Sequence, residues 1–307
     1  MKDVDIKRSP ASQFPAETAA AAAAAELPDT FEYQKPPHTN YTTMSNPNFG
    51  WGTNSQEVAS HFASNIKGKT ILITGVSPTS LSNSVIHSLV PHSPATIIAA
   101  SRSPKNISDV ISSLPANSTK FHSINLDLSS LSSVREAAKD IAALGIKIDI
   151  LLDNAGVMAI ADYRRTVDGF EMQMATNHLG HFLLYNLLRK SGSLAGPVRV
   201  VAVSSIGHEF ENGQMEYEDP WFSGGENYNA WHAYSKSKTA NLLMAVELAR
   251  RGVSAVAVHP GPIDTGLGRD LAPGELEKLR ESFEFKTPDQ GAAGLVVAML
   301  DGGVEGK

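Results

Sequence analysis

The chain contains no cysteine among its 307 residues, and this absence removes several kinds of site at once. Disulfide bonds, zinc sites built from thiolates and thiol nucleophiles all need cysteine, so the protein has none of them. A chain that needs no disulfide is compatible with a reducing compartment, and we expect a cytoplasmic protein.

The chain also lacks long apolar runs and a large excess of charge of one sign. No stretch of 18 apolar residues occurs, which argues against a transmembrane helix. The 26 Lys and Arg residues are interspersed with 32 Asp and Glu residues, for a net charge of −6. Without a basic field, neither nucleic acid nor an anionic membrane surface is a predicted partner.

The first 48 residues differ in composition from the rest of the chain. They are rich in Pro, Ser, Thr and Ala, with an unbroken run at Ala19–Ala25, and carry no sustained amphipathic period. We expect residues 1–48 to form a disordered extension, because such a composition buries too little apolar surface. Neither a transit peptide nor a secretory signal fits this acidic, weakly apolar start. We interpret residues 49–68 as a lead-in segment, and we expect translation from Met44 instead of Met1 to give a complete protein.

From residue 69 to residue 307 the chain alternates between strand-like and helix-like segments. The strand-like segments are apolar almost throughout, as strands buried on both faces should be. Helix-like stretches lie between them, and Thr287 and Gln290 predict a capping box at the start of the last one. The alternation predicts right-handed βαβ units, and therefore a single α/β domain with a Rossmann-type, doubly wound parallel sheet. The expected strands are Thr70–Thr74, Ala95–Ser101, Phe121–Leu126, Ile148–Leu152, Val198–Ser204 and Ser254–His259, and the clearest helices are Leu131–Leu144, Gly169–Leu188, Ala230–Arg251 and Pro288–Leu300.

Tyr234 and Lys238 are the most informative pair of residues. A spacing of four places both side chains on one face of a helix. An ammonium beside a phenol favours the phenolate, so we expect the Tyr234 pKa to fall below its usual value of about 10. Tyr234 is therefore a candidate proton donor or acceptor. The same spacing also arises by chance on helix faces, as Tyr185 and Arg189 show, so other motifs must decide.

The turn after the first strand, residues 75–82, is where the chain first resembles a known family. It is similar to the short-chain dehydrogenase/reductase family of the classical type, in particular to fungal retinol-dehydrogenase-like members, whose turn reads Thr-Gly-x-Ser-Pro-x-Gly-Leu-Gly. The matching residues are Thr74, Gly75, Ser77, Pro78 and Leu81. Ser80 and Ser82 replace the two later glycines, and a serine in a left-handed conformation would cost about 1–2 kcal/mol. Serine is nevertheless small, and a helix N-terminus still offers N–H groups to a phosphate, so we expect a working dinucleotide turn, with a degenerate one as the alternative.

The end of the second strand favours a particular cofactor. An NAD site usually places a carboxylate there for the ribose 2′-hydroxyl, whereas a 2′-phosphate requires an arginine. No Asp or Glu is available, but Arg102 is, with Lys105 close behind. The sequence therefore predicts NADP(H).

Three further segments match the family in order. Asp127 and Leu128 resemble its adenine contact. Asp153-Asn154-Ala155-Gly156 resembles its Asn-Asn-Ala-Gly motif, in which Asn154 would tie neighbouring strands together and Gly156 would leave room for the nicotinamide ribose. Asn177 falls where these enzymes hold a proton-relay water. His178 and His181 have no carboxylate at a ligand-like spacing, so we predict no metal site.

The last matches follow the fifth and sixth strands. Ser205 corresponds to the family's catalytic serine. The Pro-Gly-x-x-x-Thr element corresponds to Pro260, Gly261, Ile263 and Thr265, of which Ile263 would meet the nicotinamide carboxamide. All matches together run in family order over Lys69–Leu300.

The resemblance implies hydride transfer between NADP(H) and a small-molecule carbonyl/alcohol pair. Ser205 would donate a hydrogen bond to the carbonyl oxygen while Tyr234 protonates it. Lys238 would lower the tyrosine pKa and bind the nicotinamide ribose, and Asn177 would connect this lysine to solvent through water. Two other classes stay open: a catalytically impaired dinucleotide-binding regulator, motivated by Ser80, Ser82 and the short carboxyl end, and a nucleotide-sugar epimerase or dehydratase on the same fold.

The substrate leaves a weaker signal. Ser205 and Tyr234 lie 29 positions apart, a longer gap than in short-loop members of the family. Aromatic residues in this gap predict a bulky, partly apolar substrate, such as a polyketide-, terpenoid- or retinoid-like ketone of secondary metabolism, with a self-packed loop as the alternative. Gly266–Lys286 is a plausible mobile lid. The six aromatic residues are Phe210, Tyr217, Trp221, Phe222, Tyr228 and Trp231.

The carboxyl end departs from the family pattern. Members usually follow the last helix with one more strand, and this chain stops at Lys307. We expect a strand edge that is left unpaired, covered by the extension or covered by a partner chain in a homo-oligomer.

Overall fold

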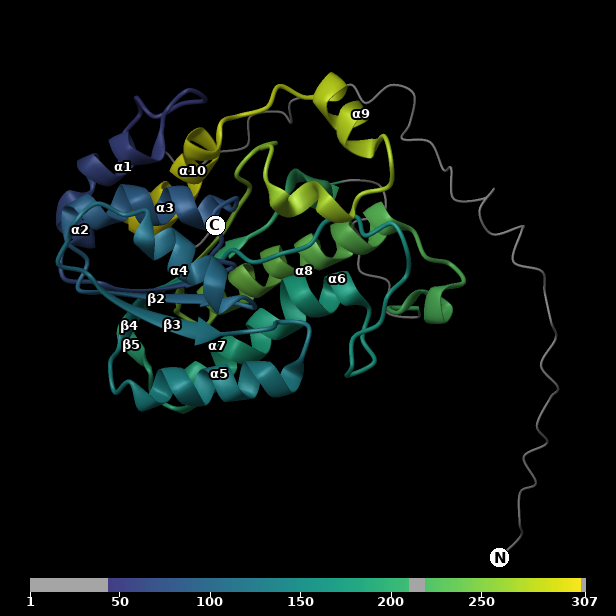
Figure 1. Ribbon diagram of the computed structural model, residues 1–307, viewed down its shortest axis with the longest axis horizontal. Helices are drawn as coiled ribbons and strands as arrows, with labels where there is room; N and C mark the ends of the chain where they lie inside the picture. Colours follow the sequence, from purple (N-terminus) through teal and green to yellow (C-terminus); the bar gives the residue numbers. More distant parts are fainter. Residues whose placement is uncertain (1–43, 210–218, 305–307) are drawn as a thin grey trace, which may run out of the picture. The chain divides into compact units, whose positions relative to one another are not determined.

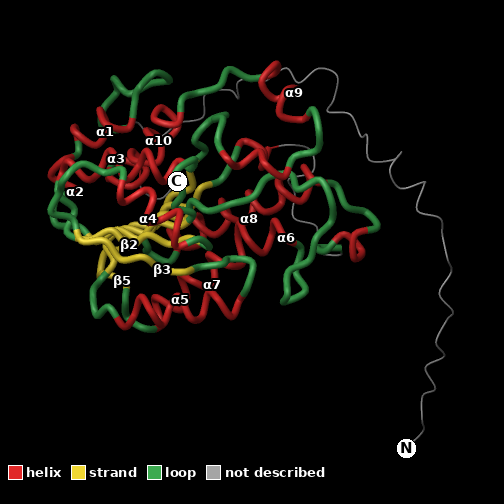
Figure 2. Tube along the Cα trace, viewed as in Figure 1, coloured by secondary structure: helices red, strands yellow, loops and turns green. Residues whose placement is uncertain are grey.

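The computed structural model of the protein describes residues 44–209 and 219–304. The predicted extension before Met44, and the aromatic residues Phe210 and Tyr217, lie outside these residues. The described chain forms one six-stranded sheet in the order β3-β2-β1-β4-β5-β6, with every neighbouring pair parallel (Figure 2). This order reverses between β1 and β4, so the predicted Rossmann-type doubly wound sheet is confirmed.

The strands follow the predicted apolar runs closely. β5 differs most, because it begins four residues before the predicted start, at Leu194, whose partner is Ile148 in β4. The sequence hides this start, since Gly196 and Pro197 interrupt the apolar run and the ladder is irregular between Ile148 and Ile150. The strands are β1 Thr70–Thr74, β2 Thr96–Ser101, β3 Lys120–Asn125, β4 Ile148–Asp153, β5 Leu194–Val203 and β6 Ser254–Val258.

Helices cover both faces of the sheet (Figure 1). One face carries α3 (Leu81–Leu89), α4 (Pro104–Ser112) and α10 (Pro288–Leu300), and the other carries α5 (Leu131–Ala143), α7 (Gly180–Lys190) and α8 (Ala230–Arg250). Each helix buries its apolar stripe against the strands, giving two cores on opposite sides of the sheet. The predicted capping box at the start of α10 is present, since Thr287 and Gln290 bond each other's backbone N–H groups.

The lead-in segment forms part of the first of these cores. It folds into α1 (Ser55–His61) and α2 (Ala63–Ile66), and α1 packs along α10. Val58 and Ile66 are fully buried. This packing explains why α10 is apolar on almost all sides: the sheet lies under one face and α1 under another. Ser45, within the predicted extension, bonds the Asp301 carboxylate from both its backbone N and its hydroxyl.

The segment predicted as one helix from Gly169 to Leu188 is divided. Glu171 caps a short helix, α6 (Met172–Met174), and a π-helical turn over Ala175–Leu179 separates α6 from α7. The apolar period does not reveal this interruption, because a π turn inserts one extra residue without breaking the buried face. Such turns are often found at functional sites, and this one contains Asn177.

Short elements complete the described chain. Four 3-10 turns connect the main elements, and α9 (Glu275–Ser282) lies in the predicted lid. No helix among the described residues combines the length and apolarity needed to span a membrane. The 3-10 turns lie at Val90–His92, Ile206–Glu209, Phe222–Gly225 and Gly266–Asp270, with a last one at Gly302–Val304.

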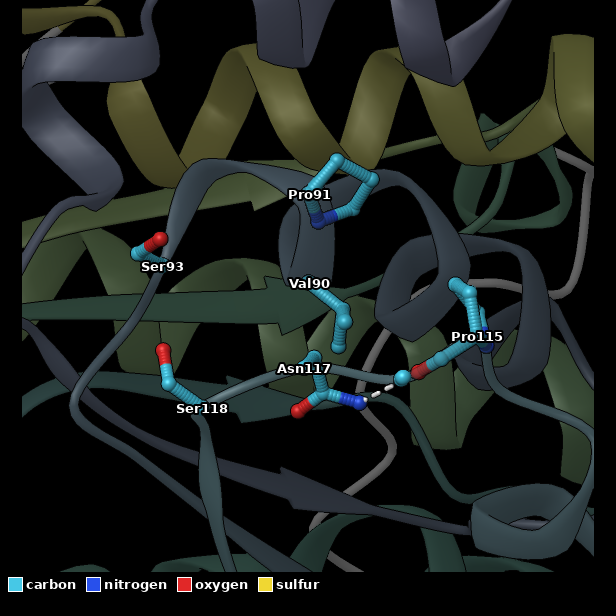
Figure 3. Close-up of a pocket in the computed structure, with 7 residues that line it drawn as sticks. Val90, Pro91, Ser93, Pro115, Asn117 and Ser118 are labelled. Carbon is cyan, nitrogen blue, oxygen red and sulfur yellow. Dashed lines mark hydrogen bonds between the residues drawn. The ribbon is translucent and has the colours of Figure 1, made fainter.

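One surface hollow of about 310 Å³ lies at the amino ends of β2 and β3 (Figure 3). Val90, Pro91 and Ser93 line one side of it, and residues 115–118 line the other. Because ligands of such sheets bind at the carboxyl ends of the strands, this hollow is on the wrong edge for the predicted chemistry.

Candidate active site

Most predicted site residues lie at or just after the carboxyl ends of the six strands, whereas Asn177, Tyr234 and Lys238 lie on helical segments. Since parallel strands end at a common edge, segments far apart in the sequence meet there. The catalytic candidates Asn177, Ser205, Tyr234 and Lys238 come together next to the end of β4. The cofactor candidates lie in the turns after β1 (Thr74 to Ser82), β2 (Arg102), β3 (Asp127, Leu128), β4 (Asn154, Ala155, Gly156) and β6 (Pro260, Gly261, Ile263, Thr265).

The turn after β1 has the backbone that a phosphate site needs. Gly75 has a φ of +75°, and a Cβ there would lie 2.7 Å from the Cα of Ala155, so only glycine fits. Ser80 is extended, with φ −98° and ψ 159°, and Ser82 lies inside the first turn of α3. The expected cost of a left-handed serine is therefore absent, because neither serine adopts that conformation.

The two serine hydroxyls stabilise this turn. Ser80 Oγ donates to Ser77 O at 2.8 Å and accepts from Ser77 N at 3.1 Å. Ser82 Oγ donates to Thr74 O at 3.1 Å and accepts from Asn154 Nδ2 at 2.7 Å. No side chain caps α3, so the N–H groups of its first turn have no side-chain partner. The residues present therefore fit a dinucleotide phosphate.

The turns after β2 and β3 present different groups. Arg102 is exposed directly after β2, while the nearby Lys105 pairs with Asp109 at 2.6 Å. The Asp127 carboxylate accepts from the backbone N and the hydroxyl of Ser129, at 3.0 and 2.7 Å. Arg102 is thus the cation at this edge for which the structure gives no ion pair among the described residues.

Tyr234 and Lys238 share one face of α8, as the spacing predicts. The Lys238 ammonium lies 5.6 Å from the centre of the Tyr234 ring and donates to Val203 O at 3.0 Å. The Ser205 hydroxyl and the Tyr234 ring face the same small space, since a Cβ on Gly207 would lie 3.4 Å from both Ser205 Oγ and Tyr234 Cε1. A Cβ on Gly156 would lie 3.6 Å from Lys238 Nζ, so this glycine keeps the space beside the lysine open. The phenol, the hydroxyl and the ammonium therefore form one cluster.

Burial sets the proton affinities of this pair, and it corrects the expectation that Lys238 lowers the Tyr234 pKa. Burial raises the pKa of Tyr234 to about 12, although the neighbouring Ser205 hydroxyl acts in the opposite direction. Burial also lowers the pKa of Lys238 to about 8. In the protein without a bound ligand, the loss of hydration thus outweighs the attraction between the two groups.

Asn177 is held rigidly within the π-helical turn. Its side chain accepts from Val157 N at 2.8 Å and donates to Val157 O and to Ser237 Oγ, at 2.9 and 2.8 Å. Ser237 in turn donates to Tyr234 O. The two amide N–H groups and one lone pair of Oδ1 are thus bonded, and the backbone carbonyl of Asn177 has a separate partner.

His181 holds that carbonyl, and the sequence did not predict this role. Its Nδ1 lies 3.0 Å from Asn177 O, and its Nε2 lies 2.9 Å from Thr74 Oγ. The Thr74 oxygen already accepts the backbone N–H groups of Asn154 and Ala155. Because the Asn177 carbonyl oxygen can only accept, Nδ1 carries the imidazole proton, and Nε2 accepts from the Thr74 hydroxyl. Burial lowers the His181 pKa to about 4, which keeps the ring neutral.

Asp153 lies beside this histidine with neither carboxyl oxygen hydrogen-bonded. The carboxyl is 3.9 Å from His181 Nε2, and burial raises its pKa well above the usual value. No group of three or more potential metal ligands occurs among the residues that the structure describes. In the sequence Asp153 stands where the family motif has its first Asn, but the isolation of its carboxyl depends on contacts that only the folded chain makes.

The loop after β6 closes the site on its remaining side. Pro262 O accepts from Lys286 N at 2.9 Å, and Ile263 pairs with Lys286 in a parallel bridge. Gly266 N lies 3.4 Å from Thr79 O in the turn after β1. The predicted lid therefore contacts the phosphate turn directly.

Comparison with known proteins agrees with this geometry. The family model for short chain dehydrogenases matches residues 69–217. The oxidoreductase fscI of Fusarium equiseti is 33% identical over 245 residues, which cover 69% of this chain and 94% of that protein. The chain belongs to the short-chain dehydrogenase/reductase family.

Within the short-chain dehydrogenases it is of the retinol-dehydrogenase-like type. Human retinol dehydrogenase 11 is 41% identical over 184 residues, covering 59% of this chain and 56% of that protein. Mouse retinol dehydrogenase 14 is 40% identical over 189 residues, covering 59% and 55%. The match thus spans little more than half the length of these relatives.

Solved structures place this short-chain dehydrogenase in the same fold. An uncharacterised protein of Mycobacterium paratuberculosis has a TM-score of 0.59 and 34% identity, with 78% of this chain and 80% of that chain covered. A blue fluorescent protein from a metagenomic library, in complex with NADPH, has a TM-score of 0.60 and 24% identity, with 78% and 93% covered.

We predict that Asp153→Asn stabilises this short-chain dehydrogenase more as the pH rises. An unfolded aspartate loses its proton near pH 3.9, whereas buried Asp153 keeps it to a higher pH. Stability from this group is therefore present below the unfolded pKa and is lost as the pH rises to the folded pKa. Asparagine does not titrate, so the variant does not lose stability in this way. Relative to the parent, its midpoint of thermal unfolding should be a few degrees higher at pH 8 and less raised at pH 4.5.

Thermal unfolding of parent and variant across this pH range measures the difference. The exposed Asp162→Asn is the control. A gain that is the same at every pH would contradict the buried, protonated carboxyl.

Proposed function

We propose that this protein is an NADP(H)-dependent oxidoreductase that interconverts a carbonyl and an alcohol. One observation carries the proposal: the Ser205 hydroxyl and Tyr234 lie together with the buried Lys238 at the edge of the sheet where α3 begins without a side-chain cap. A hydroxyl pair of this kind suits a carbonyl oxygen that gains negative charge and then a proton. The names of the relatives, retinol dehydrogenase and oxidoreductase, agree with this chemistry.

The dinucleotide would be held along the edge of the sheet. The N–H groups at the start of α3 and the hydroxyl of Ser77 suit the pyrophosphate. Asp127 and Leu128 would contact the adenine, and the backbone of Ile263 and Thr265 would meet the nicotinamide end. When bound, the nicotinamide supplies the hydride.

Arg102 supports the choice of NADP(H) over NAD(H). It is exposed at the end of β2, and the structure gives it no carboxylate partner among the described residues. A guanidinium can bind a 2′-phosphate through two hydrogen bonds, which a ribose hydroxyl cannot match.

The proton-handling residues have the protonation states that reduction needs. A Tyr234 pKa of about 12 keeps the phenol protonated at neutral pH, so it can donate to the carbonyl oxygen. Ser205 would donate a second hydrogen bond to the same oxygen. Lys238, with a pKa of about 8, can return a proton to the phenolate. Asn177 would hold the water that reprotonates the lysine, the role that the family resemblance gives this residue.

We further propose a bulky, partly apolar substrate, because the large indole of Trp231 lies beside Tyr234. The regulator alternative loses one of its motives, since Ser80 and Ser82 strain neither the turn nor the helix. A homo-oligomer and a cytoplasmic location stay predictions. Half-exposed apolar residues on α7 and α8 favour the first: Phe182, Leu243 and Val246.

We predict that Tyr234→Phe lowers turnover by at least about 100-fold, because the ring stays but the transferable proton is lost. The dissociation constant for NADPH should change less than about threefold, since the phosphate turn is untouched. Turnover on a panel of ketones and aldehydes, with NADPH fluorescence titration, measures both. Equal rates in variant and parent would remove Tyr234 from the reaction.

We predict that Arg102→Ala weakens NADPH binding by about 10- to 100-fold and leaves NADH binding nearly unchanged, because only NADPH loses a charge-assisted contact. Fluorescence titration with both nucleotides measures the ratio. Lys105→Ala is the matched control, since Lys105 already pairs with Asp109. The same loss for both nucleotides in Arg102→Ala would rule out a phosphate contact.

A further inference from the structure

Most aromatic residues between Ser205 and Tyr234 pack against one another and so leave little ring surface for a ligand. Phe222 is buried and meets Tyr228 edge-on, with ring centres 5.5 Å apart. Trp221 packs on Phe170 at 5.4 Å, and the Lys236 ammonium covers Phe222 at 4.4 Å. Of the aromatic residues in this segment that the structure describes, Trp231 remains as a candidate to contact the substrate.

Trp231 lies directly beside the reacting phenol. It precedes Tyr234 by three residues on α8, so the two side chains share a helix face. Their ring centres are 6.2 Å apart with planes at 86°, an edge-on contact. Trp231 is partly exposed whereas Tyr234 is buried, so the indole lies between the phenol and the surface.

The indole is fixed in place by the lid. Its N–H donates to Glu275 Oε2 at 2.8 Å, and Glu275 is the first residue of α9. The same lid bonds the loop after β4 through Ala161 N and Asp270 O, at 3.0 Å. At its other end the lid meets the phosphate turn, where Gly266 N bonds Thr79 O.

We propose that Trp231 is the specificity-determining wall of the substrate site and that Glu275 positions it. The inference rests on the proposed function, because it places a carbonyl oxygen at the Tyr234 and Ser205 hydroxyls. The group next to that carbonyl must then lie along the indole. Since the indole N–H is already bonded to Glu275, the wall offers carbon only, so it selects an apolar substituent over a polar one.

Two probe pairs test the wall: octanal and octanol as apolar ligands, and glyceraldehyde and glycerol as polar ones. In Trp231→Ala, the KM for octanal should rise by about tenfold, with the KM for glyceraldehyde and the NADPH dissociation constant unchanged. Glu275→Ala should raise the octanal KM in the same direction, because the indole is released. Glu275→Gln should restore the parent value, since its side-chain oxygen still accepts from the indole. Glu281→Ala, an exposed site on the same helix, is the control.

Titration calorimetry of octanol with NADP+ present separates this inference from the proposed function. A lower octanol affinity in Trp231→Ala than in the parent supports the wall. This holds even if the parent reduces neither aldehyde, because that result would overturn only the proposed oxidoreductase function. Parent-like octanal KM and octanol affinity in Trp231→Ala overturn the wall. A Glu275→Gln variant that behaves like Glu275→Ala overturns the positioning role of the hydrogen bond.

Discussion

The hydroxyl of Thr74, at the carboxyl end of β1, is the contact on which the rest of the site depends. It accepts the backbone N–H groups of Asn154 and Ala155, and it donates to His181. The Thr74 carbonyl meanwhile accepts from Ser82 and from the Asn154 side chain. One residue thus joins the phosphate turn, the end of β4 and the π-helical turn. Because Thr74, Ser82 and His181 are buried, each of their polar groups would cost about 1–3 kcal/mol if left unbonded, so the arrangement is strongly determined.

The same buried network explains how one edge of a sheet can both bind a dinucleotide and handle a proton. Through His181, Thr74 orients the Asn177 carbonyl, and through Ser237 the Asn177 side chain reaches the backbone of Tyr234. Burial away from water then sets the two pKa values: it raises the pKa of the Tyr234 phenol and lowers the pKa of the Lys238 ammonium. The charged form of either group costs free energy here until a ligand supplies a partner.

Much of this architecture could be predicted from the sequence, because it depends on patterns of residues that are close together in the chain. Strands of a parallel sheet that is buried on both faces appear in the sequence as continuous apolar runs. The capping box of Thr287 and Gln290 marks the start of α10. Motif order also located the six loops of the site. The errors have long-range causes. The start of β5 depends on the pairing of Leu194 with Ile148 in β4. The π turn contains Asn177, whose side chain bonds Val157 and Ser237 from other parts of the chain.

The electrostatics and the polar contacts of the site could not be predicted for the same reason. The spacing of Tyr234 and Lys238 gives their proximity but not the extent of their burial, and burial reverses the expected direction of the tyrosine pKa. Ser80 and Ser82 departed from the family pattern, but their conformations depend on bonds to Ser77, Thr74 and Asn154. The bond from Trp231 to Glu275 joins residues 44 positions apart, a contact for which no local signal exists.

Replacement of Thr74 by valine tests the central claim most directly, because valine keeps the shape of the side chain and removes only the hydroxyl. Thr74→Ser, which keeps the hydroxyl, is the matched comparison, and the NADPH dissociation constant of both variants is measured where circular dichroism shows them folded. We predict that Thr74→Val binds NADPH at least about tenfold more weakly than the parent while Thr74→Ser binds like it. Equal affinity in Thr74→Val and the parent would contradict the claim that this hydroxyl holds the site together.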